Sequence, residues 1–396
     1  MSAVLHATSA SAQPASSLSA HRCAQAVAAQ RSGHALSREF YCDAELFERE
    51  VQELLLRHWH CVGHHSQVRE PGDFFTTSFC GEPLLVVRGQ DREVRALLNV
   101  CRHRGSRVCT QETGRVRGGA FVCPYHAWSY GLDGRLRAAR HMPADFDRAS
   151  HGLKTIHTRV LEGLIFVSFA DAPLGLAHVE AALAGAARPY GWAQAQVAHR
   201  ETYPVRANWK LAVENYMECY HCGPAHEEYS RFHLYARPAP LNRASDDRVR
   251  DRAGALGVAV EELDYWALNA RPGEEAAGSA RSALADGAVS GSEDGRPLAP
   301  LMGHFSDYDG GVTFFDVGLT SDFLAYPDHG LIYRFIPNTV HSTDMEVIWL
   351  VREDAAICEV NQRGLHALPN AGGVLMPEEY AVRQFQDWVR AQLSRS

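Results

Sequence analysis

The fold of this chain is decided by two short stretches, CRHRGS at residues 101–106 and CPYHAW at residues 123–128. Each stretch holds one cysteine and one histidine, and each follows a short apolar run of the kind that forms a β-strand. Thiolate and imidazole groups are common ligands of zinc and of iron–sulfur clusters. We therefore expect two metal-binding loops at one end of a small sheet.

The spacing of these candidate ligands distinguishes between metals. They are Cys101, His103, Cys123 and His126. Structural zinc sites generally take cysteine pairs and histidine pairs from separate arms, with two or more residues between ligands. Here each arm offers one thiolate and one imidazole, which favours a [2Fe–2S] cluster with two Cys on one iron and two His on the other. The pattern predicts a redox centre, with a zinc site as the alternative.

Composition limits the class of protein. The 396 residues are 46% hydrophobic and 22% charged, which is ordinary for a globular chain of two domains. A net charge of −8 argues against nucleic acid as a partner, because phosphate requires a basic surface. No apolar run approaches the ~20 residues that span a bilayer, and no secretory signal opens the chain. Ten sparse cysteines do not suit a disulfide scaffold, so we expect a reduced, cytoplasmic protein without a membrane partner.

The first half of the chain predicts a tail and a β-rich region. Residues 1–35 are rich in Ala, Ser and Gln, with almost no large apolar residues, so we expect a mobile tail. Residues 36–170 begin with a helix signalled by Asp43 and continue as short β runs between turn residues. Asp133-Gly134 predicts a hairpin turn.

The second half, residues 171–396, mixes helices and strands. A helix is expected through NWKLAVENYMECYH, ending at a break at Gly223-Pro224. Residues 243–310 look loop-like, with a helical patch near VEELDYWAL, and the next forty residues look like strands. Residues 354–367 and 376–392 look like closing helices.

A second candidate metal site lies in NWKLAVENYMECYHCGPAHEEY, residues 208–229. His221 and His226 would lie ~140° apart around an unbroken helix, but Pro224 allows His226 to fold back toward His221. Two imidazoles and one carboxylate form the facial triad that binds Fe(II) and leaves positions open for O2. Isolated histidine pairs of this spacing are mostly surface residues, so the first metal site is what favours iron here.

Two glutamates and two cysteines lie close to these histidines in the sequence. Glu218 and Glu214 precede His221 by one and two helical turns, where a carboxylate can hydrogen-bond a ligand imidazole. Cys219 and Cys222 form a C-x2-C pair, which suggests redox or zinc chemistry in isolation. Because they share a turn with the histidines, we interpret the two cysteines as packing residues.

The segment from about 45 to 170 resembles the Rieske domain of the Rieske non-heme iron oxygenases, and residues 208–229 resemble their catalytic domain. The stretches NWKLAVENYMECYHC, GSEDGRPLAPLMG and DMEVIWLVRED are similar to the branch that acts on quaternary amines such as glycine betaine. The resemblance runs from about residue 36 to the C-terminus. It implies an α+β protein, with an all-β Rieske [2Fe–2S] domain at 36–170 and a helix-grip catalytic domain with an antiparallel sheet at 171–396.

The resemblance also implies a ligand set and an assembly. The mononuclear Fe(II) would be held by His221, His226 and Asp354, the last in DAAICEVNQRG, where the family places its acidic ligand. The connection before Asp354 is shorter than in the family, and Glu353 is the nearest substitute. The implied assembly is a homotrimer in which one subunit's cluster faces its neighbour's iron, with Glu218 bridging them.

The activity implied is O2-dependent hydroxylation of an N-methyl group of a quaternary amine, giving N-demethylation and formaldehyde. No Gly-rich dinucleotide fingerprint follows any strand, so we expect a separate NAD(P)H-dependent, ferredoxin-type reductase that docks near His103 and His126.

Two alternatives remain at this level, namely a Rieske oxygenase acting on an aromatic or other amine, and a Rieske electron-transfer protein whose second domain is not catalytic. A cationic amine would be bound by aromatic faces. The aromatic candidates are Trp266, Phe314, Phe315, Phe323 and Tyr326.

Overall fold

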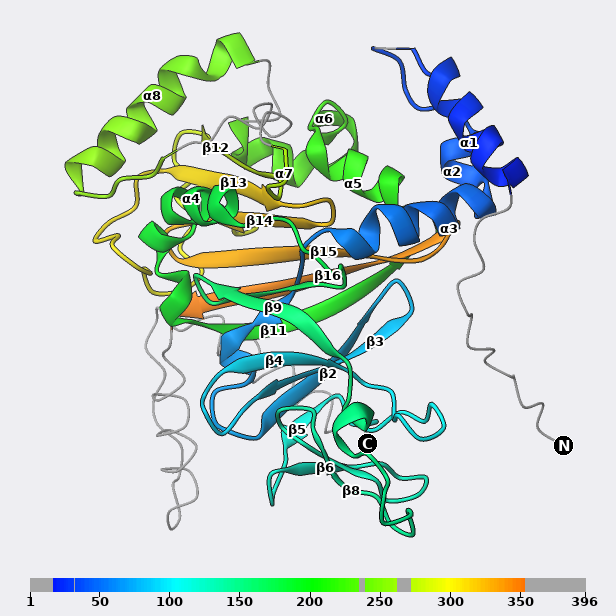
Figure 1. Ribbon diagram of the computed structural model, residues 1–396. Coiled ribbons are helices and arrows are strands. Elements are labelled where there is room, and N and C mark those ends of the chain that lie inside the picture. Colours follow the sequence, from blue (N-terminus) through cyan, green and yellow to red (C-terminus); the bar gives the residue numbers. More distant parts are fainter. Residues whose placement is uncertain (1–16, 32, 235–238, 262–271, 353–396) are drawn as a thin grey trace, which may run out of the picture. The chain divides into compact units, whose positions relative to one another are not determined.

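Three antiparallel sheets form the described part of the chain, which comprises residues 17–31, 33–234, 239–261 and 272–352 of a computed structural model (Figure 1). Helices pack beside these sheets, so the prediction of an α+β fold is confirmed. The expected closing helices, together with Glu353 and Asp354, lie outside the described residues. Within the described residues, no helix has both the length and the apolar character needed to cross a membrane.

The first sheet has seven strands in the order β1-β10-β9-β4-β3-β2-β5. Successive side chains of a strand point to opposite faces, so β3 contributes to two cores. Leu85 packs in the same apolar cluster as Cys101 and Cys123, and its neighbour Leu84 packs in a separate cluster. The strands are β1 (His60–His64), β2 (Asp73–Phe79), β3 (Glu82–Arg88), β4 (Val94–Leu98), β5 (Thr113–Arg115), β9 (Thr155–Leu161) and β10 (Leu164–Ser168).

A small second sheet carries one of the candidate metal loops. It consists of β6 (Ala120–Val122), β7 (Ser129–Gly131) and β8 (Leu136–Ala138), in that order. The predicted hairpin turn at Asp133-Gly134 joins β7 to β8, and Gly134 has a φ of +81°, which glycine adopts without strain. CPYHAW is therefore the loop between β6 and β7.

The third sheet has six strands in the order β11-β16-β15-β14-β13-β12. On one of its faces, the α4 face, Phe315 and Phe323 pack with helix α4 (Ala177–Ala186). The opposite face, the α5–α7 face, packs against α5 (Trp209–Met217) and α7 (Glu227–Phe232), which flank the short α6 (Cys222–Ala225). The strands are β11 (Ala195–Val205), β12 (Ala277–Ala283), β13 (Gly311–Val317), β14 (Ser321–Ala325), β15 (His329–Thr339) and β16 (Ser342–Arg352).

The N-terminal region is more helical than expected. Ser17–Ala29, within the stretch predicted to be a mobile tail, forms helix α1. Its alanine-rich sequence explains this, because helix propensity needs no large apolar side chain. Helices α2 (Glu39–Cys42) and α3 (Ala44–Glu53) follow, and the predicted start at Asp43 is confirmed, because its side chain accepts hydrogen bonds from the first turn of α3.

Two elements occupy the region expected to be a loop. Helix α8 spans Ala239–Ala255, and strand β12 forms the edge of the third sheet. The β12 sequence AGSARSA has no large apolar residue, so its pattern does not indicate a strand. Pairing with β13 and packing against α4 decide its conformation, which is a tertiary effect.

Residues on the two sides of position 170 share one core. Trp59 and Phe166 pack in the same apolar cluster as Trp192 and Ile348. Polar contacts reinforce this packing, since the buried Glu275 carboxylate accepts a hydrogen bond from the Trp59 backbone N–H at 2.7 Å.

Candidate metal centres

Each of the two cluster loops, residues 101–106 and 123–128, closes on its own cysteine. The backbone N–H of Cys101 donates to the Ser106 carbonyl at 2.8 Å, and that of Gly105 donates back to the Cys101 carbonyl at 3.0 Å. In the second loop, the Cys123 N–H donates to the Trp128 carbonyl at 2.8 Å. Local backbone bonds therefore position both cysteines.

The two cluster loops meet through their histidines. The ring centroids of His103 and His126 are 4.6 Å apart, while Cys101 and Cys123 are buried in one apolar cluster. His126 is exposed. Desolvation, with His103 and Arg104 nearby, lowers the pKa of His126, which favours the neutral imidazole that binds metal. The loops therefore bring together two buried thiols, a half-buried imidazole and an exposed one.

The donor atoms fit a [2Fe–2S] cluster. The Nδ1 atom of His103 is buried and has no hydrogen-bond partner in the described chain, although Trp128 stacks on its ring at 4.8 Å. A buried imidazole nitrogen without a partner is costly unless something binds it. The two loops offer one pair of thiols and one pair of imidazoles, which is the ligand set of a cluster with two Cys on one iron and two His on the other.

Tyr130 is a contributor to this site that sequence reasoning missed. Its hydroxyl lies 3.2 Å from the Cys101 Sγ and accepts a hydrogen bond from the Arg102 N–H at 3.0 Å. Burial, followed by the hydrogen bond to Cys101, raises the pKa of Tyr130 well above its ordinary value. The phenol therefore keeps its proton, and a Cys101 thiolate would accept a hydrogen bond from it. The sequence held one signal for this role. Tyr130 lies two residues after Trp128, so strand alternation places both side chains on the same face, in the apolar cluster of Cys101 and Cys123.

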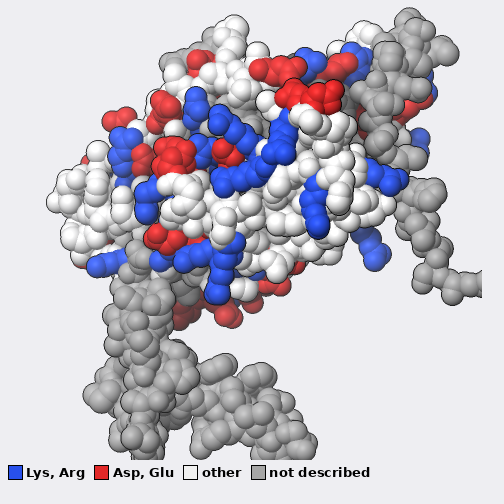
Figure 2. All heavy atoms as spheres, turned by 60° about the horizontal axis from the view of Figure 1, so that its bottom comes forward, with Lys and Arg blue, Asp and Glu red and all other residues white. Residues whose placement is uncertain are grey.

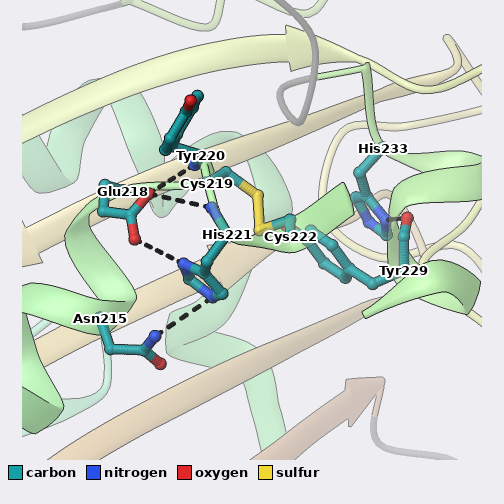
Figure 3. Close-up of a disulfide and its surroundings, with 8 residues drawn as sticks. All are labelled: Asn215, Glu218, Cys219, Tyr220, His221, Cys222, Tyr229 and His233. Carbon is teal, nitrogen blue, oxygen red and sulfur yellow. Dashed lines mark hydrogen bonds and ion pairs between the residues drawn. A yellow bond between two sulfur atoms is a disulfide. The ribbon is translucent and has the colours of Figure 1, made fainter. Parts of the chain in front are cut away.

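The second candidate centre is the catalytic turn, which we define as residues 218–226; Figure 3 shows the side chains of its first part, Glu218–Cys222. Helix α5 ends at Met217, and Glu218 has an extended backbone, so the prediction of a helix running through His221 is wrong. The Glu218 carboxylate accepts hydrogen bonds from the backbone N–H groups of Tyr220 and His221. Such side-chain bonds to the backbone compete with helix continuation.

His221 is held in one tautomer. Its Nδ1 lies 2.6 Å from the Glu218 Oε1, and this hydrogen bond is the main reason that the pKa of Glu218 is lowered. Because the carboxylate accepts, Nδ1 carries the proton, and Nε2 keeps a lone pair that faces the Asn215 side-chain amide at 3.2 Å (Figure 3). This is the form that a metal ligand requires.

The structure brings the predicted histidine pair together. The ring centroids of His221 and His226 are 5.2 Å apart. We expected the helix to break at Pro224. Instead it breaks before His221, and Pro224 lies inside the short helix α6. A proline is tolerated in a first helical turn, because its missing N–H has no partner there in any case.

Two other predictions at the catalytic turn are wrong. The Glu214 carboxylate accepts a hydrogen bond from the Tyr41 hydroxyl at 2.9 Å, whereas the His221 ring is hydrogen-bonded to Glu218. Cys219 and Cys222 form a disulfide that brackets His221, rather than packing as free thiols (Figure 3). The turn at 219–222 brings the two sulfurs together, which the expected continuous helix would not do.

The candidate aromatic residues divide between the two faces of the third sheet. Phe315 and Phe323 stack on each other at 4.7 Å on the α4 face, away from the catalytic turn. Phe314 and Tyr326 lie on the α5–α7 face. Trp266 lies outside the described residues.

Family comparisons cover both candidate centres. Residues 58–157 match the Rieske [2Fe-2S] domain, and residues 193–354 match the catalytic domain of ring hydroxylating alpha subunits. The first match contains both cluster loops, and the second contains the catalytic turn. The protein is therefore an oxygenase of the Rieske non-heme iron class, which carries a [2Fe–2S] cluster and a mononuclear iron.

The chain is also similar to individual proteins over most of its length. It is 33% identical to the glycine betaine monooxygenase oxygenase subunit of Pseudomonas aeruginosa (strain UCBPP-PA14), over 89% of this chain and 87% of that protein. The corresponding subunit of Chromohalobacter salexigens is 34% identical, over 91% and 86%. The carnitine monooxygenase oxygenase subunit of Escherichia coli (strain K12) is 37% identical, over 48% and 52%. The chain thus belongs to the Rieske non-heme iron monooxygenases, as an oxygenase subunit that works with a separate reductase.

Solved structures agree on the fold. The quaternary ammonium Rieske monooxygenase CntA in complex with L-carnitine superposes with a TM-score of 0.56 at 20% identity, covering 89% of this chain and 79% of that one. Naphthalene 1,2-dioxygenase with indole bound gives a TM-score of 0.58 at 20% identity, covering 84% and 75%. The predicted class is confirmed, and the match to a catalytic domain favours an oxygenase over an electron carrier.

Proposed function

We propose that this enzyme hydroxylates an N-methyl group of a quaternary amine such as glycine betaine. One atom of O2 enters a methyl C–H bond, and the other leaves as water with two electrons and two protons. The N-hydroxymethyl product then loses formaldehyde and a proton, which leaves a tertiary amine. The observation that carries this proposal is the likeness, over 89% and 91% of the chain, to two glycine betaine monooxygenase subunits.

We assign the ligands of the two centres from the donor geometry of the described residues, and we add Asp354, which lies outside them, on the resemblance to the family alone. The proposed ligands are Cys101 and Cys123 for one cluster iron, His103 and His126 for the other, and His221, His226 and Asp354 for the mononuclear iron. When bound, the mononuclear iron supplies O2 activation with electrons received from the cluster. The rest of the chain from residue 171 would then form the catalytic domain, and residues 36–170 the Rieske domain.

We further propose that Glu218 links neighbouring subunits of a homotrimer. Its Oε1 orients His221, and its side chain remains 49% exposed. The adjacent Tyr220 side chain is 97% exposed, and a large aromatic residue in that state suits a surface that another subunit covers. A carboxylate between two ligand histidines would hold both rings and join the centres through one polar path.

Electrons would come from a ferredoxin-type reductase that oxidises NAD(P)H, a coenzyme of the cytoplasm. The exposed His126 marks the docking site, with Tyr125 exposed beside it and the Arg104 guanidinium 5.5 Å from the Tyr125 ring centroid. In Figure 2, which turns the bottom of Figure 1 forward, Lys and Arg side chains lie among Asp and Glu side chains. The Arg104 charge beside Tyr125 suits a reversible, charge-guided encounter.

The test combines metal analysis with oxygen uptake. Anaerobically purified protein should hold three irons per chain, and a reductase with NADH should drive O2 uptake and formaldehyde release with glycine betaine. Carnitine, choline and aromatic acids are the comparison substrates. Uptake with aromatic acids alone would contradict the quaternary-amine assignment, and turnover from NADH without a reductase would contradict the electron route.

A further inference from the structure

Two aspartates on the α5–α7 face of the third sheet lie opposite each other without a compensating charge. Asp316 of β13 pairs in register with Asp322 of β14, and their residues are 5% and 6% exposed. Directly opposed residues of an antiparallel pair project from the same face, where like charges destabilise the sheet. We call these two residues the acid pair.

The acid pair lacks the cationic partners that other buried acids have, although the Gly278 backbone hydrogen-bonds the Asp316 carboxylate. Asp309 pairs with Arg281, and Asp328 pairs with His329 at 2.8 Å. By contrast, the Asp316 Oδ2 atom is buried without any hydrogen-bond partner, and no Lys or Arg of the described chain forms an ion pair with Asp316 or Asp322. A buried carboxylate without a cation is costly.

Burial governs the charge state of this pair. It raises the pKa of Asp316 to about 9, with the neighbouring Asp322 adding to the effect, and it raises the pKa of Asp322 to about 7. Bringing a cation to the pair would favour the ionised forms, because an opposite charge nearby stabilises a carboxylate.

The acid pair lies on the face beneath the catalytic turn. Tyr333 of β15 pairs in register with Asp322, and its ring centroid is 4.8 Å from that of Tyr216 in α5. The Tyr216 hydroxyl is also buried without a hydrogen-bond partner in the described chain. Tyr216 precedes His221 by five residues, and Phe232 of α7 packs on the same face. Both helices that flank the catalytic turn therefore touch this surface.

We propose that the acid pair, with the rings of Tyr216 and Tyr333, binds the quaternary ammonium group of the substrate. A quaternary ammonium has no N–H, so hydrogen bonds cannot recognise it, and it needs negative charge and aromatic faces instead. The acid pair offers the first and the two tyrosines offer the second. The identity of the substrate rests on the proposed function, whereas the binding of a cation at this site does not.

The competing role for the acid pair is a shared proton that only keeps the sheet neutral. The two roles differ in their response to charge. A cation site distinguishes trimethylammonium from the tert-butyl group, which has nearly the same shape and no charge, whereas a neutral proton-sharing pair does not.

The direct test measures binding of tetramethylammonium to the full chain with its metals by isothermal titration calorimetry. The variants are Asp316→Asn, Asp322→Asn and the double variant, with the exposed loop residue Asp294→Asn as the charge control. We expect binding to the parent and the control, and an affinity lower by roughly tenfold or more in each acid-pair variant. Thermal midpoints no lower than the parent's would show that the variants fold, because Asn keeps the shape of Asp.

The outcomes separate this inference from the proposed function. Equal tetramethylammonium affinity in the parent and the folded double variant, or no binding to the parent, overturns the inference. If binding depends on the acid pair but no quaternary amine is demethylated, the inference stands and the proposed function falls. If glycine betaine is demethylated with the same KM by the double variant, and 3,3-dimethylbutanoate competes equally against both proteins, the function stands and the inference falls.

Discussion

The cluster loops and the catalytic turn both present candidate iron ligands, but they hold them by different means. In the cluster loops, backbone hydrogen bonds within a few residues position Cys101 and Cys123, and both sulfurs are buried. At the catalytic turn, a side-chain contact between Glu218 and His221 and a disulfide hold an exposed segment. The comparison shows that one site is built by local backbone geometry and the other by side-chain contacts.

The largest expected effect concerns the cluster loops. Cys101→Ser or His126→Ala should abolish the visible absorption of the [2Fe–2S] cluster and all turnover, because each iron has only two protein ligands. Most of the fold should persist, since the surrounding sheet supplies its own core. Absorption spectra and acid-labile sulfide analysis measure the loss, and Cys109→Ser is a matched control at a nearby free thiol. Stoichiometric zinc without sulfide in the parent protein would show that the loops hold a different metal.

The next effect concerns the side-chain contact at the catalytic turn. Glu218→Gln should keep both metals and substrate binding, yet lower steady-state turnover by ~10–100-fold, as the loss of a ligand-orienting hydrogen bond typically does. Glu214→Gln is the control, because Glu214 bonds to Tyr41 instead. Pre-reduced protein with substrate and O2 should show slow cluster reoxidation in the Glu218→Gln variant only. Reoxidation at the parent rate would exclude Glu218 as the link between centres.

A smaller effect is expected in the pH dependence of stability. The folded-state pKa values of Asp316 and Asp322, about 9 and about 7, lie above the ordinary 3.8, so the folded protein binds more protons than the unfolded chain. Stability from this pair is therefore present at low pH and is lost as pH rises toward 9. The ionisable groups facing the pair include Tyr333, which pairs in register with Asp322, and Tyr216, which interacts with Asp322; burial raises the pKa of both tyrosines, so they stay neutral in this range.

Thermal midpoints between pH 5 and pH 9 measure this effect. In the Asp322→Asn variant, the free energy of unfolding should fall less with rising pH, by an amount on the order of 1–2 kcal/mol at pH 9. Asp294→Asn, an exposed site, should leave the decline unchanged. An identical pH profile in the parent and the Asp322→Asn variant would mean that the acid pair is not held in its raised-pKa state.

The smallest expected effect concerns the reduction potential of the cluster. Tyr130→Phe removes the hydroxyl that lies 3.2 Å from the Cys101 Sγ. A hydrogen bond to a ligand sulfur raises the reduction potential, so the variant should have a lower one. A bond worth ~1 kcal/mol corresponds to roughly 40 mV for one electron. Protein-film voltammetry measures the shift, with the exposed Tyr125→Phe as control, and equal potentials would show that the Tyr130 hydroxyl does not act on the cluster.

The contrast between local backbone geometry and longer-range contacts also explains which predictions from the sequence succeed. The hairpin at Asp133-Gly134 and the helix start at Asp43 follow from turn and capping chemistry within a few residues. The meeting of His221 with His226 was also predicted, although the break that allows it lies elsewhere in the chain. Strand β12 was missed, because a strand of small residues forms only when a neighbouring strand is present. Helix α8 was also missed.

The sequence by itself determined the identity and spacing of the candidate ligands and the division into a β-rich half and a mixed half, and its resemblance to a known family indicated the class of enzyme. These depend on residue types at short separations, which the printed chain shows directly. Only the tertiary structure decided the end of α5 at Met217, the Cys219–Cys222 disulfide and the facing of Asp316 toward Asp322. Each of these depends on strand register or side-chain reach, because a shift of one residue in β14 would turn Asp322 to the opposite face.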